Sequence, residues 1–192
     1  MTLTLRSFFT CIILFLLFSN HTKAQTKGKY IKASIGIGYS YSEYDETYNQ
    51  FIEGSGFYAQ GEYVVGLTSW FSVKPYAGVI LTSTSKDAEN NPQDYKVTTK
   101  ALLIGGKARI CAPIPYVAPY IESGVGASFG SFETYTPMTN FKKDGVLVHV
   151  PFTIGLAVGK RHNIDIEFTY YYHSAADQFS GAFAGGFSFP LD

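Results

Sequence analysis

The sequence predicts an all-β fold, an antiparallel transmembrane β-barrel of about eight strands with long outer loops and short periplasmic turns. Apolar and polar residues alternate along most of the chain, which is the period of extended strands. Aromatic residues make up 17% of the chain, which also contains 19 Gly. Charged residues reach only 16%, compared with about 25% in ordinary soluble domains. This composition is typical of a barrel in a membrane.

The N-terminal residues predict how such a barrel reaches its membrane. Arg6 precedes an unbroken apolar stretch, Phe8 to Phe18, and small residues suited to cleavage follow at 22–24. The apolar stretch is shorter than the roughly 20 residues of a transmembrane helix, although an uncleaved anchor is an alternative. We therefore expect a signal peptide at 1–24 and an outer-membrane barrel domain at 25–192.

Eight segments alternate with a period of two and end at polar or turn-forming residues. The expected strands are 29–42, 57–67, 70–83, 96–110, 116–132, 146–158, 164–173 and 179–189. In the first strand, Ile and Tyr alternate with Ser and Gly. The second and third alternate Phe, Val and Leu with polar residues or Gly, and Pro75 near the start of the third is tolerated there. The fourth is less regular because Leu102 and Leu103 are neighbours.

The last four strands separate two faces more clearly. In the fifth, Val117 and Ile121 share a face, while Gly, Ser and the carboxylate of Glu122 share the other. A face in contact with water would carry long charged side chains, so this polar face fits a crowded lumen. The sixth strand has the purest apolar stripe, but Pro151 within it predicts a bulge or an unpaired position. The seventh alternates Ile, Phe and Tyr with polar residues, and the eighth alternates Phe with Ser and Ala.

Long and short connections alternate between these strands, as they do in barrels of a Gram-negative outer membrane. The long connections are expected at 43–55, 84–95 and 131–145, the short ones at 68–69, 111–115 and 159–163, and the last connection at 174–178. The expected localisation is therefore the outer membrane of a Gram-negative cell, reached by a cleaved signal peptide. Outer-membrane lipid is then the surrounding partner.

The alternation places charged side chains of both signs on the inner face. The expected lumen charge network contains Lys32, Glu62, Lys74, Lys107, Arg109, Glu122, Asp165 and Glu167. An isolated charge costs several kcal/mol to desolvate, so these charges must be paired, and Glu122 is expected to pair with Lys74, Lys107 or Arg109. About eight strands enclose an interior that side chains just fill. We therefore expect a plugged lumen with little or no pore activity.

Aromatic residues gather near the predicted strand ends, where membrane barrels carry aromatic belts. The expected belt residues are Tyr39, Tyr41, Trp70, Phe71, Tyr116, Phe129, Tyr170, Tyr172, Phe187 and Phe189. In a soluble secreted barrel that binds an apolar ligand, the apolar stripe would instead face inward. The side chains that test this alternative are Val148, Val150, Phe152 and Ile154.

Three stretches carry a resemblance to a known family. They are Pro119-Tyr120 leading to Gly124-Val-Gly126-Ala-Ser128, the strand Phe152 to Gly159 with its basic turn and Ile164 to Tyr172, and the ending Gly186-Phe-Ser-Phe189. Together they resemble the outer-membrane protein β-barrel domain family, the small porin-like barrels similar to the OmpA membrane domain and OmpX. The resemblance covers about residues 28–192 and implies a small transmembrane barrel. Members commonly end on an aromatic residue, whereas here Pro190-Leu191-Asp192 follow Phe189.

The composition and the spacing of potential ligand residues exclude several classes of function. The formal net charge is +0, so long-range charge does not favour a nucleic-acid partner. The sequence has neither zinc-ligand spacing nor a glycine-centred calcium loop, and we expect no metal, cofactor or catalytic residue. The expected role is structural, or an interaction of the loops with an extracellular ligand or surface.

An enzyme that modifies lipids, a hydrolase or an acyltransferase, is the main alternative. His173, Ser174 and Asp177 lie near one strand end, and His149 is expected near the same rim. A serine activated by a histidine and oriented by a carboxylate is the chemistry that such an enzyme needs. However, adjacent residues of a strand point to opposite faces, so His173 and Ser174 are poorly placed to act together.

Overall fold

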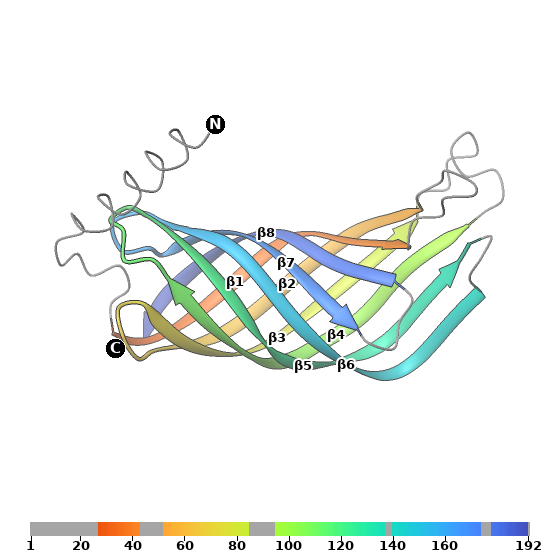
Figure 1. Ribbon diagram of the computed structural model, residues 1–192, viewed down its shortest axis with the longest axis horizontal. Coiled ribbons are helices and arrows are strands. Elements are labelled where there is room, and N and C mark those ends of the chain that lie inside the picture. The colour runs from red at the N-terminus through yellow and green to blue at the C-terminus, as the bar shows by residue number, and fades with distance from the viewer. Residues whose placement is uncertain (1–26, 43–51, 85–94, 137–139, 174–177, 192) are drawn as a thin grey trace, which may run out of the picture.

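The computed structural model describes residues 27–42, 52–84, 95–136, 140–173 and 178–191. They form a closed barrel in which consecutive strands pair antiparallel and β1 pairs with β8 (Figure 1). The strands are β1 (Gly28–Ser42), β2 (Glu53–Gly66), β3 (Phe71–Thr84), β4 (Lys96–Cys111), β5 (Val117–Tyr135), β6 (Asn140–Val158), β7 (Ile164–His173) and β8 (Gln178–Leu191). The predicted eight-stranded antiparallel β-barrel is therefore confirmed. Within these ranges, no helix is long and apolar enough to cross a membrane.

All eight predicted strands are present, but some begin or end at other residues. β2 starts at Glu53, so 53–55 belong to a strand and not to the predicted first loop. The predicted loop at 131–145 is wrong, because β5 continues to Tyr135 and β6 already starts at Asn140. These extra residues pair with one another across the hairpin. They are mostly polar, so they form strands through the continuing ladder without the apolar alternation that marks the others.

The two ends of the barrel differ. The short turns after β2, β4 and β6 lie together at one end, on the left of Figure 1, with the end of β8. The extended β5–β6 hairpin projects at the opposite end. We refer to these as the turn end and the loop end. β5 and β6 extend furthest toward the loop end, whereas β7, with 10 residues, stops well short of them.

Apolar side chains cover the outside of the barrel. In β6, Val148 is 68% exposed, Phe152 47% and Ile154 49%. Val150, at 41%, lies on the same face. Residues between them, such as Thr153, are buried in the interior. This polarity is the reverse of the one that a soluble barrel with an apolar interior requires, and it fits a barrel surrounded by lipid.

The two prolines within strands interrupt the ladder without changing its register. Pro151 pairs with Tyr171 of β7, but pairing with β5 stops after Phe152 and resumes at His149 in the same register. Pro75 pairs with Gly106 of β4 and breaks the ladder with β2 in the same way. A proline has no N–H to donate, so one neighbouring ladder loses its bond there. Of the two outcomes predicted for Pro151, the structure has the unpaired position and not the bulge.

Candidate functional site

The lumen holds the charged side chains that the sequence places inside the barrel. The contributing positions are Lys32 of β1, Glu62 of β2, Lys74 of β3, Lys107 and Arg109 of β4, Glu122 of β5, and Asp165 and Glu167 of β7. All eight are buried. The strand register places Lys32 directly opposite Glu62 and Arg109 opposite Glu122. The structure therefore brings all eight side chains into one contiguous group.

Glu122 is at the centre of this group because it contacts three cations. One of its oxygens lies 2.7 Å from Nζ of Lys74 and 2.5 Å from Nε of Arg109, and the other lies 2.9 Å from Nζ of Lys107. Glu62 lies 2.6 Å from Lys107 and 3.2 Å from Lys74. Lys74 and Lys107 stand directly opposite each other on β3 and β4. The two carboxylates thus offset a like-charge pair that would otherwise destabilise the sheet.

The other half of the group joins β1, β4 and β7. Nζ of Lys32 lies 2.6 Å from Glu167 and 3.1 Å from Asp165. The two terminal nitrogens of Arg109 each lie 3.2 Å from an oxygen of Asp165, a bidentate pair. The centroid of the Tyr120 ring lies 3.5 Å from Cζ of Arg109, and the Tyr120 hydroxyl donates to Glu167 over 2.9 Å. Four cations meet four carboxylates, so the buried charges balance.

Inward-facing glycines make room for the large polar side chains of the lumen. A Cβ at Gly126 would collide with the Tyr76 hydroxyl and with His149, and a Cβ at Gly155 would collide with the Tyr120 ring. This close approach accounts for Gly126 on the polar face of the fifth predicted strand. At these positions large side chains point into the lumen, and glycines stand where the strands leave them room.

A second polar cluster lies further toward the loop end and consists of uncharged groups and two histidines. Ser128 Oγ lies 2.7 Å from Nδ1 of His149 and 2.9 Å from Nε2 of His173. The Tyr76 hydroxyl lies 2.5 Å from Nε2 of His149. The four residues therefore form a chain of hydrogen bonds from β3 to β7, and all are buried. Phe132 packs on His173 with ring centroids 4.8 Å apart.

This cluster differs from the catalytic alternative considered from the sequence. Ser174 and Asp177 lie outside the described residues, so their position relative to His173 is not defined. The serine that His173 contacts is Ser128, which is distant in sequence. His149 and His173 stand directly opposite each other on β6 and β7. Alternation along β5 and β3 puts Ser128 and Tyr76 on the inner face, but only the register between strands shows which histidine each one meets.

Replacing Ser128 by Ala tests the energetic role of this cluster. The substitution leaves one buried nitrogen on each histidine without its partner, which we expect to lower the free energy of unfolding by about 1–3 kcal/mol. Denaturant unfolding of the barrel folded in lipid vesicles measures this change. Ser123→Ala is the matched control, because Ser123 lies on the same strand but is exposed on the outside, and its effect should stay within about 0.5 kcal/mol. Equal effects of the two substitutions would contradict a structural role for the Ser128 hydrogen bonds.

The predicted belt aromatics lie on the outside or at the rims. Tyr116 is 60% exposed and Phe189 53%. Toward the loop end, Tyr41 stacks on Phe179 with ring centroids 5.1 Å apart, and Tyr170 lies 5.9 Å from the same ring. Toward the turn end, two pairs of rings are in contact, namely Trp70 with Phe71 and Phe187 with Phe189. The other predicted belt residues, Tyr39, Phe129 and Tyr172, are exposed or half-buried.

Known proteins resemble this chain in fold. No protein-family model and no curated protein matches the sequence. Among solved structures, Ail, the attachment invasion locus protein of Yersinia pestis, is 17% identical with a TM-score of 0.50, covering 85% of this chain and 100% of Ail. Neisserial surface protein A is 13% identical with a TM-score of 0.54, covering 86% of this chain and 98% of the other. These two similarities show a shared fold, that of small outer-membrane barrels.

The outer membrane enzyme PagL is a third similar structure, 12% identical with a TM-score of 0.45, covering 84% of this chain and 99% of PagL. A similarity at this level carries no argument about activity. Within the described residues, no group of three or more His, Cys, Asp and Glu side chains is placed to hold a metal ion.

Proposed function

We propose that this protein is a small integral outer-membrane β-barrel with a plugged lumen, acting in envelope structure or in surface interaction, with little or no pore activity. The observation that carries the proposal is the group of eight buried, mutually paired charges across the lumen. A barrel of about eight strands has an interior just wide enough for its own side chains. Ion pairs between strands that are not neighbours, such as Lys32 of β1 with Glu167 of β7 and Lys74 of β3 with Glu122 of β5, occupy that interior.

The proposed location is the outer membrane of a Gram-negative cell. It is supported by the predicted signal peptide at 1–24 and by the apolar exterior of the barrel. In this orientation the turn end faces the periplasm and the loop end faces the outside. The lipid of the membrane is then the partner of the apolar face.

A role in surface interaction is supported by the β5–β6 hairpin. Residues 140–148 of β6 pair with β5 on one side, and no strand in the described part of the chain pairs with their other side. An unpaired strand edge presents backbone N–H and C=O groups to which a partner segment can add as a further strand. Lys142, Lys143 and Asp144 lie in this edge and disfavour nonspecific pairing between copies.

Planar-bilayer recording of the purified full-length barrel tests the plugged lumen. We expect little or no stable conductance from the wild type. The double variant Lys32→Ser with Glu167→Ser removes one cation and one carboxylate, so it keeps the charge balance but shortens two side chains that bridge the lumen, and we expect it to conduct more. Folding of both proteins is checked by heat-modifiable gel migration. Stable single-channel steps from the wild type would contradict the proposal.

The lipid-modifying enzyme remains the second candidate, because Ser128 contacts two histidines. The arrangement supports it less well, since Ser128, His149 and His173 are at most 4% exposed and a lipid substrate must reach the nucleophile. Membrane lipids from cells that carry wild type or His173→Ala distinguish the two functions. An unchanged lipid profile is the result expected for a structural barrel, and loss of a modification would favour the enzyme.

A further inference from the structure

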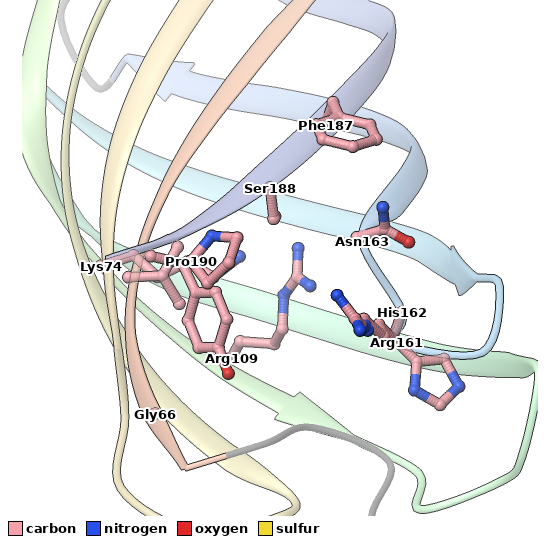
Figure 2. A pocket seen from close by; sticks show the side chains of 11 residues that line it. Gly66, Lys74, Arg109, Arg161, His162, Asn163, Phe187, Ser188 and Pro190 are labelled. Atoms are coloured by element: carbon pink, nitrogen blue, oxygen red, sulfur yellow. The ribbon is translucent and has the colours of Figure 1, made fainter. Parts of the chain in front are cut away.

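A cavity of about 400 Å³ opens at the turn end of the barrel. Its polar wall includes Lys74 and Arg109 from the lumen and Arg161 and His162 from the β6–β7 turn, and its apolar wall includes Val64 and Pro190. In Figure 2, Arg109 reaches toward the middle of this group, with Ser188 and Pro190 of β8 on one side and the turn residues on the other. The volume is within the range of small-molecule sites, about 300–1,000 Å³.

The cavity wall presents cationic side chains, of which Arg161 lies outside the charge-balanced lumen group. Three of its lining side chains, Lys74, Arg109 and Arg161, are cations, and the wall contains no Asp or Glu. Arg109 uses three N–H groups for Glu122 and Asp165. A guanidinium has five N–H donors, so two remain for a ligand. Arg161 is exposed on the turn and is available without breaking the lumen network.

His162 supplies the second observation. It is only 6% exposed, and neither of its ring nitrogens has a hydrogen-bond partner. Buried polar atoms in proteins almost always have a partner, which can be a protein group, a water or a ligand. The cavity that His162 lines is where such a partner would be bound.

We propose that this cavity binds an organic phosphate, with the phosphate oxygens held by Arg161, Arg109 and His162 and the organic group held against Val64 and Pro190. Arginine pairs well with phosphate because its planar fork matches two phosphate oxygens. The apolar wall selects a phosphate that carries an apolar substituent over the inorganic ion. Such a group is present both in anionic phospholipid headgroups and in soluble phosphate esters. This binding site goes beyond the structural role proposed above, and it does not depend on whether the lumen conducts ions.

The test titrates butyl phosphate into the full-length barrel in maltoside micelles, followed by calorimetry and ³¹P NMR. We expect saturable binding at one site per chain, and weaker binding of inorganic phosphate. Arg161→Gln should weaken butyl phosphate binding by at least about tenfold, the loss expected for a charge-assisted contact. Lys160→Gln is the matched control, since Lys160 is the preceding residue, is exposed and does not line the cavity. The affinity of the Lys160→Gln variant for butyl phosphate should stay within about twofold of the wild type.

Repeating the titration in phosphatidylcholine nanodiscs, with and without phosphatidylglycerol, distinguishes the source of the phosphate. Competition by phosphatidylglycerol would support the site with a lipid headgroup as its ligand, and no competition would support it with a soluble ester. Heat-modifiable migration establishes that each variant is folded. Absence of saturable binding, or equal losses in Arg161→Gln and Lys160→Gln, would overturn the proposal. Neither result would bear on the conductance of the barrel.

Discussion

Replacing Glu122 by Gln is expected to lower the free energy of unfolding of the barrel by about 3–5 kcal/mol. Glu122 is buried and pairs with Lys74, Lys107 and Arg109. Gln has nearly the same shape, so the substitution removes a charge without opening a large cavity. Three buried cations then lose a shared carboxylate, and the lumen has an excess positive charge. An unpaired buried charge is the costly outcome of breaking such a network.

Equilibrium urea unfolding in lipid vesicles measures this loss. Glu133→Gln is the matched control, because Glu133 lies on the same strand, is only half-buried and stands outside the lumen group. Its effect should be about 0.5 kcal/mol or less. The double variant Glu122→Gln with Lys107→Met restores the balance of charges and should recover part of the lost stability. Equal stability of wild type and Glu122→Gln would show that the network does not hold the barrel together.

Alternation along a strand predicts which of its charged side chains share a face. A strand alternates with a fixed period of two, so once Lys107 is placed inside, Arg109 follows two residues later. The sequence does not predict which lumen side chains contact each other, because these contacts depend on the register between strands. Lys74 stands opposite Lys107, and Ser128 meets His149 and His173, only because β3, β4, β5, β6 and β7 pair as they do.

Strand ends were predicted well only where lipid enforces alternation. Along β7 every second residue is apolar, and the predicted bounds agree with the observed Ile164–His173. Beyond the apolar band, at 131–135 and 140–145, both faces tolerate polar residues, and the pattern that marks a strand disappears while the backbone ladder continues. The cavity at the turn end was missed for a related reason. Its residues come from β1, β2, β3, β4, β8 and a turn, and no local spacing connects them.

Replacing Ile35 by Lys is expected to destabilise the barrel in a bilayer by about 2–4 kcal/mol, the cost of a lysine on the lipid face near the membrane midplane. Ile35 is 63% exposed at the centre of β1, opposite Ala59 and Gly185. Ile31→Lys is the matched control. Ile31 faces the same way but stands beside Phe189 near the turn end, where a lysine reaches the interface and should cost about 0–1 kcal/mol. Urea unfolding of both variants in phosphatidylcholine vesicles gives the comparison. A barrel whose exterior faced water would gain solubility from either lysine, so equal and negligible effects would contradict the membrane placement itself.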